Sequence, residues 1–320
     1  MTIYAGLVTY NSRDDLPGCL AGLRAQTMPV TIIALDNASS DGSADWLRAN
    51  APEVRLIVSG ENLGYGRGHN AIIRSAALQA GDYYLALNPD AALAPDYVAR
   101  LVETLAARLD AGWATGKLLM DDPPRIYSAG HGLLRSGFAF NIGYGLPDDA
   151  RFAESREVFG APGAAVVYKA ELIRDLSADG DFFDPAMFLY AEDSDVDWRA
   201  RRQGWRCWYV AEAVAHHRGG VANSEMRIMA VSNRYLSVLK NATTYDLIAY
   251  NVPYMIAHCA VRLLITPRLG VHLAAHILRG APAALRRRRP ARIEAGTLHE
   301  WFAWSAQQPV RQRSRLMERR

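Results

Sequence analysis

Apolar and polar positions alternate in two ways along the first ninety residues of the chain. Mainly apolar runs of five or six residues have the length of buried strands. Between them, apolar residues recur at helical spacing, as at Leu16, Leu20 and Leu23. This alternation predicts an α/β fold with a mostly parallel sheet and helices on both faces. The expected strands are residues 3–8, 30–35, 54–58 and 83–87.

The pattern changes in the middle of the chain and again near residue 225. Residues 121–150 are rich in Gly, Pro and aromatic residues, which indicates a loop or a β-hairpin insertion. From Glu225 onward helical patterns dominate. We therefore expect an α/β domain over residues 1–225 and a helical, basic region over residues 226–320.

Charge is distributed unevenly, although the formal net charge is only +3. The segment from Arg262 to the C-terminus contains 13 Arg and three acids, a net of +10, so the preceding 261 residues carry about −7. A basic end on a mildly acidic body is typical of proteins that bind a polyanionic surface, such as a membrane or a nucleic acid. The arginines lack interleaved aromatic residues or a groove-reading helix, so we expect no nucleic acid partner.

Residues 244–266 are apolar enough to raise the question of a membrane-spanning helix. Polar residues and a proline interrupt the run, so it lacks the ~20 uninterrupted apolar residues of a clean span. We expect instead an amphipathic helix in the interface of an anionic membrane, with Arg286–Arg289 and the aromatic residues of 301–304 at the lipid headgroups. The alternative is a solvated run of arginines beside an ordinary pair of packed helices.

The cysteine pattern and the N-terminus bear on location. The three cysteines lie far apart, which argues against a disulfide framework and fits a reducing compartment. The chain opens directly on a strand, without a basic and apolar leader. We expect a cytoplasmic protein bound peripherally to the inner face of the cell membrane.

Polar side chains follow the expected strands at the points where each strand ends. The carboxyl ends of parallel strands share one edge of a sheet, where ligands bind, and Asn and Asp there can bond a nucleobase or a ribose hydroxyl. Gly64, Gly66 and Gly68 would let the backbone approach a diphosphate, but they also fit a plain turn. The strand-end residues are Thr9, Tyr10, Asn11, Asp36, Asn37 and Asn62.

An acidic turn follows the fourth expected strand. Asn88 and Pro89 precede Asp90, and the fixed proline backbone would turn Asp90 sharply out of the strand. One carboxylate, together with phosphate oxygens and water, suffices to hold Mg²⁺ or Mn²⁺. Taken alone, the same residues also fit an ordinary turn before the next helix.

The densest group of titratable residues is an acidic cluster with four carboxylates among residues 192–197. On a helix Asp193 and Asp197 share one face, and like charges raise each other's pKa, which would help one act as a general base near neutral pH. An acidic helix N-terminus explains one or two of the four. The pair His216–His217 follows one short strand later. Imidazole suits Mn²⁺ or a phosphate oxygen, and the sequence does not decide which histidine is the ligand.

Taken in order, these stretches resemble the family 2 inverting glycosyltransferases, in particular their bacterial rhamnosyltransferase-like branch. The match spans about residues 1–225, and its specificity comes from six motifs in the right order. They are Val8–Asn11, Leu35–Ser43, Glu61–Asn70, Leu87–Asp90, Phe183–Asp195 and Val214–His217.

The resemblance implies a GT-A fold, a nucleotide-sugar donor and inversion by single displacement. It gives Asp193 the role of general base, and it gives Asp90 and His216 the role of binding Mg²⁺ or Mn²⁺. The residues that it adds to the donor-binding set are Gly66, Asn70 and Asn88.

The function implied is transfer of a rhamnose-type deoxyhexose from a dTDP- or UDP-sugar to a lipid-linked or polysaccharide acceptor in the synthesis of cell-envelope glycans. Two alternatives stay open. The same fold can use another donor sugar, such as a hexose, an N-acetylhexosamine or galactofuranose, or it can be a non-catalytic nucleotide-binding membrane scaffold. Loss of Asp193 or Asp90 would favour the scaffold, and both residues are present.

Overall fold

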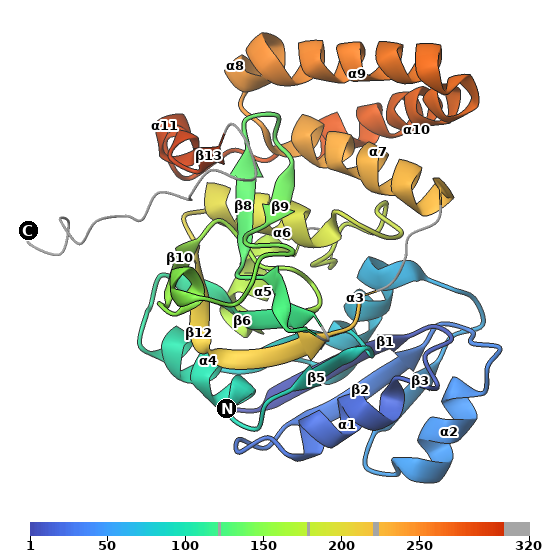
Figure 1. Cartoon of the computed structure of the whole chain (residues 1–320), viewed down its shortest axis with the longest axis vertical. Coiled ribbons are helices and arrows are strands. Elements are labelled where there is room, and N and C mark those ends of the chain that lie inside the picture. Colours follow the sequence, from blue (N-terminus) through green and yellow to red (C-terminus); the bar gives the residue numbers. More distant parts are fainter. Residues whose placement is uncertain (121–122, 178–179, 220–223, 304–320) are drawn as a thin grey trace, which may run out of the picture.

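The computed structural model describes residues 1–303 except 121–122, 178–179 and 220–223. Ten strands within these residues form one central sheet (Figure 1). They are β1 (Ile3–Thr9), β2 (Thr31–Asp36), β3 (Arg55–Val58), β4 (Tyr83–Leu87), β5 (Ala91–Leu93), β6 (Ala111–Met120), β7 (Arg125–Ser128), β10 (Arg156–Val158), β11 (Ala165–Lys169) and β12 (Arg206–His217). The order along the sheet is β10-β12-β6-β11-β4-β1-β2-β3, with β5 and β7 pairing with β12 and β6.

The N-terminal half of the sheet is parallel, as the alternating sequence pattern predicts. β1 pairs in parallel with both β2 and β4, and β3 pairs in parallel with β2. The other half is mixed, because β11 runs antiparallel between β4 and β6 while β12 is parallel to β6. All four expected strands form, within one residue of their predicted ends.

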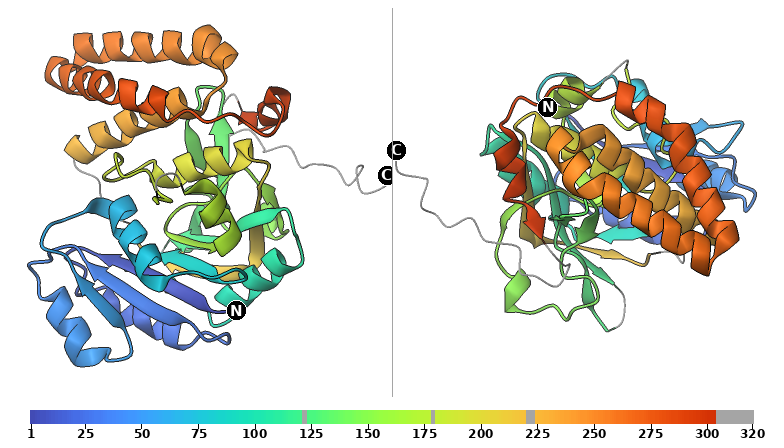
Figure 2. Two further views of the ribbon diagram at one scale, coloured as in Figure 1. Left: turned by 180° about the vertical axis from the view of Figure 1, so that it is seen from behind. Right: turned by 90° about the horizontal axis from the view of Figure 1, so that it is seen from above.

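Helices cover both faces of this sheet (Figures 1 and 2). Successive residues of a strand point to opposite faces, so Ile32 and Ala34 of β2 pack in one core and Ile33 in the other. The first core includes α1 (Leu16–Arg24), α2 (Ser43–Asn50) and α4 (Tyr97–Ala106). The second includes α3 (Gly64–Ala76), α5 (Ala170–Leu176) and α6 (Glu192–Arg202).

The predicted hairpin in residues 121–150 is present. It consists of β8 (His131–Leu134) and β9 (Ala139–Asn141), which pair antiparallel, and β13 (Phe302–Ala303) adds to β8 as a third, parallel strand. A short 3₁₀ helix, Ala150–Phe152, follows the hairpin. The pairing of β13 with β8 therefore attaches the end of the described chain to the hairpin.

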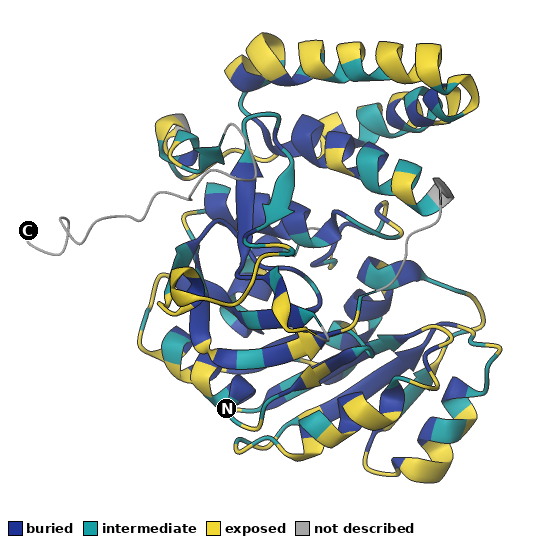
Figure 3. Ribbon diagram, viewed as in Figure 1, coloured by how far each residue is buried: buried dark blue, intermediate teal, exposed yellow. Residues whose placement is uncertain are grey.

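The C-terminal part of the chain is helical. It comprises α7 (Ser224–Asn241), α8 (Thr244–Asp246), the π-helical turn Leu247–Asn251, α9 (Val252–Ile265), α10 (Pro267–Arg286) and α11 (Ala295–His299). Helix α7 packs on α6, α10 packs on α7, and α9 lies on α10 as the outermost layer (Figure 1). Tyr235, Leu236 and Ile277 are buried between α7 and α10, whereas no residue of α9 is buried (Figure 3).

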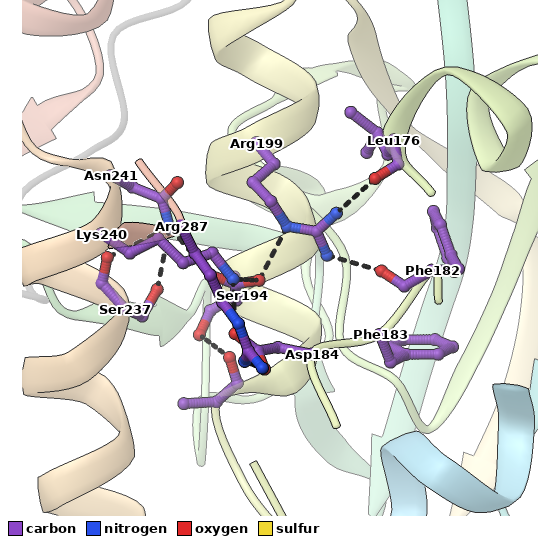
Figure 4. Close-up of polar contacts among 12 residues, drawn as sticks. Leu176, Phe182, Phe183, Asp184, Ser194, Arg199, Ser237, Lys240, Asn241 and Arg287 are labelled. Atoms are coloured by element: carbon purple, nitrogen blue, oxygen red, sulfur yellow. Dashed lines mark hydrogen bonds and ion pairs between the residues drawn. The ribbon is translucent and has the colours of Figure 1, made fainter. Parts of the chain in front are cut away.

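The joint between α6 and these helices is ionic. The Lys240 ammonium group of α7 lies 2.8 Å from a carboxylate oxygen of Asp184 and 2.7 Å from one of Asp195 (Figure 4). Asp195 also accepts hydrogen bonds from Arg199 at 2.8 Å and from Asn241 at 2.8 Å. Lys240 and both carboxylates are at least nine-tenths buried, so this cluster fixes α7 against α6 by paired charges in the interior.

Two residues of the arginine run and Trp301 take part in this packing. Arg287 contacts Asp184, and Arg288 donates hydrogen bonds to the carbonyls of Leu239 and Ala242. Trp301 lies over the Arg201 guanidinium, 4.2 Å from it, rather than outward. Arg287, Arg288 and Trp301 therefore help to fasten the C-terminal segment to the sheet domain, and contact of the arginine run with lipid headgroups stays a prediction. Trp304 lies outside the described residues.

Candidate functional site

Only one of the four clustered carboxylates is open to solvent. Glu192, Asp195 and Asp197 are at most 6% exposed, whereas Asp193 is partly exposed at the start of α6. A carboxylate oxygen of Asp193 accepts a hydrogen bond from the Gly163 backbone N–H at 3.0 Å. Asp193 is thus the member of the cluster that an acceptor hydroxyl can reach.

Asp197 holds α6 in place from inside. Its carboxylate accepts hydrogen bonds from the Trp113 indole at 2.9 Å and the Ala161 N–H at 3.1 Å, and it pairs with His131 at 2.7 Å. Burial raises the pKa of Asp197 to about 6, although the hydrogen bond and charge of His131 act in the opposite direction. Asp193 and Asp197 are four residues apart on one helix, but their environments differ. Asp197 is buried and bonded within the protein, whereas Asp193 is partly exposed.

Glu192 is a buried neighbour of the candidate base. Burial, with a smaller contribution from the charge of Asp193, raises the pKa of Glu192 well above its usual range. One of its carboxyl oxygens has no hydrogen-bond partner among the described residues. Glu192 is shielded from solvent, so Asp193 is the carboxylate of this pair that solvent reaches.

The chain enters α6 through a strained turn. Tyr190 and Ala191 both have left-handed backbone conformations, with φ of 68° and 70°. The Asn233 side chain of α7 donates hydrogen bonds to the carbonyls of Leu189 and Tyr190, at 3.0 and 3.1 Å. Consecutive left-handed residues other than glycine cost free energy and persist where the surrounding structure holds them. Helix α7 therefore helps to set the position from which Asp193 projects.

Strand pairing brings the acidic turn of Asp90 close to Asp193. In the antiparallel pair of β11 and β4, Ala165 lies opposite Leu87, and the Asn88 N–H donates to the Ala164 carbonyl at 2.9 Å. The Gly163 N–H, one residue earlier, is the donor to Asp193. The turn at the end of β4 and the start of α6 thus meet on the same loop, which the sequence motifs could not show.

The histidine beside Asp90 is His217. Its Nε2 lies 3.1 Å from a carboxylate oxygen of Asp90 and 3.3 Å from the Asn88 amide nitrogen. His217 is buried, whereas His216 is exposed, because neighbouring residues of β12 point to opposite sides of the strand. We therefore replace His216 by His217 in the candidate metal pair. Burial raises the pKa of Asp90, but hydrogen bonds and the charge of His217 outweigh this effect and lower it overall.

Asp90 and His217 fit two positions around a divalent ion. Two ligands of one ion, each about 2.1 Å from it at a right angle, lie roughly 3 Å apart, which is the separation found here. The described residues contain no group of three or more His, Cys, Asp or Glu side chains that could hold a metal. A metal would therefore take its remaining ligands from phosphate oxygens and water.

The polar residues after β1 and β2 gather at one edge of the sheet, as predicted. The Thr9 hydroxyl donates to Asp36 at 3.0 Å, and the Ser39 N–H donates to the same carboxylate at 3.0 Å. The Asn37 side chain accepts from the Leu63 N–H at 3.1 Å, which ties the ends of β2 and β3 together. Thr9, Asp36 and Asn37 are buried and form the floor of these loops.

Tyr10, Asn11 and Asn62 lie above this floor. Tyr10 is 53% exposed, and the exposed Asn11 accepts a hydrogen bond from the Ser40 N–H at 2.9 Å. Asn62 accepts from the Gly64 N–H at 2.9 Å in a local turn. Their contact with a donor nucleotide stays a prediction, and the loop geometry leaves Tyr10 and Asn11 exposed.

Gly66 and Asn70 take part in the packing of α3. Both lie inside α3, whose first residue is Gly64. A Cβ at Gly66 would lie 3.1 Å from the Phe183 Cβ, and the Asn70 amide both donates to and accepts from the Phe183 backbone, at 2.8 and 2.9 Å. At Gly64, where φ is +75°, a Cβ would lie 2.0 Å from the Phe188 carbonyl oxygen. Gly66 and Asn70 therefore pack α3 on residues 183–188, and their contact with a donor stays a prediction.

Tyr127 is a site residue that the sequence analysis missed. Its ring meets the His217 ring edge-to-face at 4.4 Å. Burial raises the pKa of Tyr127 to about 12, and the charges of Asp193 and Asp90 contribute in the same direction. Tyr127 therefore lies among the three groups of the candidate site. It belongs to no motif, and only its place in an aromatic-rich insertion marked it.

Comparisons with known proteins agree with this geometry. A family model described as glycosyl transferase family 2 matches residues 5–129. A curated relative is the N-acetylglucosaminyl-diphospho-decaprenol L-rhamnosyltransferase of Mycobacterium tuberculosis, which is 31% identical over 230 residues, 66% of this chain and 74% of that protein.

Two solved structures share the fold. GalNAc-T7 with UDP, GalNAc and Mn²⁺ superposes with a TM-score of 0.61 at 12% identity, over 80% of this chain and 51% of that one. The mannosyltransferase PcManGT from Pyrobaculum calidifontis, in complex with GDP-Man and Mn²⁺, superposes with a TM-score of 0.54 at 16% identity, over 90% of this chain and 88% of that one. The predicted GT-A fold is thereby confirmed.

Proposed function

Since the chain belongs to glycosyl transferase family 2, we propose that it transfers a sugar from a nucleoside-diphosphate donor to a lipid-linked acceptor with inversion of configuration. Asp193 acts as the general base. The observation that carries this proposal is the meeting of the partly exposed Asp193 and the Asp90–His217 pair on the loop of Gly163 and Ala164. A non-catalytic scaffold would have no need of one accessible carboxylate among three buried ones.

Different residues of the chain accept the proton, position α6 and bind the nucleoside. Asp193 takes the proton of the acceptor hydroxyl as that oxygen attacks the sugar carbon, and the backbone hydrogen bond from Gly163 orients its carboxylate. The buried Asp197 and Asp195 hold α6, so that the base keeps its position during the reaction. The loops of Thr9, Asp36 and Asn37 bind the nucleoside at the carboxyl edge of the sheet.

Asp90 and His217 would hold Mg²⁺ or Mn²⁺ together with the donor's phosphates, and the ion would stabilise the charge that develops on the leaving diphosphate. The variants Asp90→Ala and His217→Ala should each weaken binding of a nucleoside diphosphate by roughly 10-fold or more in the presence of Mn²⁺. The binding that remains should no longer respond to chelator. Isothermal titration with UDP and dTDP, with Mn²⁺ or EDTA, measures both effects.

His216→Ala is the matched control for these variants. Its side chain is exposed and on the other side of the same strand, so donor binding should stay within about twofold of the unmodified protein. If His216→Ala is as harmful as His217→Ala, the metal pair is not the one that this geometry supports.

The donor sugar is a rhamnose-type deoxyhexose carried by dTDP or UDP in this proposal, and the acceptor is a lipid-linked intermediate of cell-envelope glycan synthesis. The mycobacterial relative supports both choices, because its name gives an L-rhamnosyl group and a diphospho-decaprenol acceptor. A thermal-shift screen of nucleotide sugars with Mn²⁺ tests the donor. Selective stabilisation by a hexose, N-acetylhexosamine or galactofuranose donor would replace rhamnose by that sugar.

The outer helix α9 supports a peripheral position on the inner face of the cell membrane. The helical segment Thr244–Ile265 is the one stretch among the described residues that is long and apolar enough to cross a membrane, by length and composition alone. Val252, Met255 and Cys259 pack one side of α9 on the helices beneath. No acid occurs from Leu247 to Ile293. A helix held flat in this way fits interfacial binding to anionic lipid.

The double variant Ile256→Asp with Leu264→Asp should bind anionic vesicles roughly 10²-fold more weakly, because two apolar side chains that are 62% and 83% exposed would no longer enter the lipid. Sedimentation with phosphatidylglycerol vesicles measures the bound fraction. Leu109→Asp with Val58→Asp is the matched control, since these side chains are exposed on the sheet domain. Equal losses for both pairs would refute attachment through α9.

A further inference from the structure

A cavity of about 280 Å³ lies at the joint of the sheet domain and the C-terminal helices. Its wall includes Phe182 and Pro185 of the segment before α6, Arg199 of α6, Lys240 of α7 and Arg286–Arg289 at the end of α10. Figure 4 shows Arg199, Lys240 and Arg287 converging from these separate elements. None of the candidate site residues lines this cavity, so it is a separate feature of the molecule.

The charge of the cavity is positive. Six cationic side chains line it, against the carboxylates of Asp181 and Asp184. Asp181 already pairs with Arg74, 2.6 Å away, and Asp184 pairs with both Lys240 and Arg287. Adding Arg74 and the buried Asp195, which pairs with Lys240, still leaves more cations than anions. The wall thus carries positive charge that the protein's own acids do not match.

Packing explains only half of the arginine run. Arg288 donates to the carbonyls of Leu239 and Ala242, and Arg287 contacts Asp184. Arg286 and Arg289 are exposed, and within the described residues their guanidinium groups form no hydrogen bond or ion pair. Cations at a helix C-terminus are favourable, but that effect is small and does not require two free guanidinium groups at one cavity.

We propose that this cavity binds a phosphate-bearing anion, held by Arg286 and Arg289 with Arg287 between them. Guanidinium groups bind phosphate oxygens through paired, charge-assisted hydrogen bonds. A volume of about 280 Å³ lies just below the roughly 300–1,000 Å³ of drug-sized ligand sites and suits a small group such as phosphate or diphosphate. The bound anion bridges α10 to α6 and to the segment before it, and so reinforces the joint behind the catalytic helix.

The test measures binding of inorganic diphosphate to the full-length protein in EDTA, by isothermal titration at fixed ionic strength. The variant Arg286→Ala with Arg289→Ala should bind at least roughly tenfold more weakly, since it removes the charge-assisted hydrogen bonds that two guanidinium groups supply. These two side chains have no partner in the described structure, so their loss leaves the fold intact. Arg268→Ala with Arg279→Ala is the matched control, because it removes the same charge from exposed positions of the same helix outside the cavity.

The source of the phosphate is decided in a second arm with phosphatidylglycerol vesicles. If the headgroup is the ligand, the Arg286/Arg289 pair weakens vesicle binding more than the control pair does, and free diphosphate displaces the protein. If the ligand is a free phosphate compound, both pairs affect vesicle binding equally while diphosphate binding still depends on Arg286 and Arg289. Equal diphosphate affinity in the unmodified protein and both variants, or equal losses in both, overturns the proposal.

Discussion

Replacing Asp193 by Asn should lower the rate of sugar transfer by roughly 10²-fold or more, the usual contribution of a general base. The amide has nearly the shape of the carboxylate but cannot take up the acceptor proton. Donor binding should stay unchanged, because the donor loops lie at the sheet edge and do not include this side chain. Turnover with the accepted donor and acceptor, and titration of the nucleoside diphosphate, separate the two effects.

The neighbouring Glu192→Gln variant is the control for this experiment. Burial raises the pKa of Glu192 well above its usual range, which favours the neutral carboxyl group, and the amide of Gln resembles that group in shape and charge. Transfer should fall by less than roughly tenfold. If Glu192→Gln abolishes transfer while Asp193→Asn retains it, the roles of the two residues are reversed.

Replacing Lys240 by Met should lower the free energy of unfolding by about 3–5 kcal/mol, the typical cost of removing one partner from a buried ion pair. Asp184 and Asp195 would lose the ammonium group that lies between them, and both are buried. A loss of this size is a large fraction of the about 5–15 kcal/mol that stabilises an ordinary protein. Urea unfolding of the full-length chain measures it.

Lys117→Met provides the comparison, since Lys117 pairs with Asp148, a side chain that is 31% exposed. That change should cost about 1 kcal/mol or less. A Lys240→Met variant as stable as Lys117→Met would show that the buried cluster contributes little.

The pH dependence gives a second measurement of the same cluster. Burial acts to raise the pKa of Asp184, but Lys240, a backbone hydrogen bond and Arg287 lower it to about 2, from an ordinary value of 3.8. A carboxylate with a lowered pKa stabilises the fold above its ordinary pKa, and this contribution is lost as the pH falls through about 2. The stability difference between Lys240→Met and the unmodified protein should therefore be largest near neutral pH and shrink in acid.

Local patterns in the sequence predict the sheet and its ligand edge well. The strands β1 to β4 are short apolar runs whose boundaries follow from composition, and the polar residues after them meet because parallel strands end on the same side. The acidic cluster can also be recognised in the sequence, but the different roles of its carboxylates cannot. Asp195 and Asp197 are neutralised by Lys240 and His131, partners 45 and 66 residues away that no spacing rule identifies.

Two other predictions depended on features that the sequence leaves open. Whether His216 or His217 faces Asp90 depends on which side of β12 is buried, and a one-residue change of register would reverse it. In the sequence alone, the glycines of residues 64–68 are equally compatible with a phosphate-binding loop and with close packing of a helix. In the structure, Gly66 and Gly64 contact Phe183 and Phe188, more than one hundred residues later, as close packing of the helix requires.

The Lys240 cluster also limits how this protein can exchange parts with its relatives. A chimera joined at the predicted boundary of residues 225 and 226 would take its catalytic helix from one parent and Lys240 from the other. Unless the second parent supplies a cation at the same depth, Asp184 and Asp195 would lose the ammonium group that they share, and Asp195 would keep Arg199 as its remaining cationic partner. Recombination within the family should therefore succeed when the segment from Asp184 to Arg287 is inherited from one parent, and fail when it is divided.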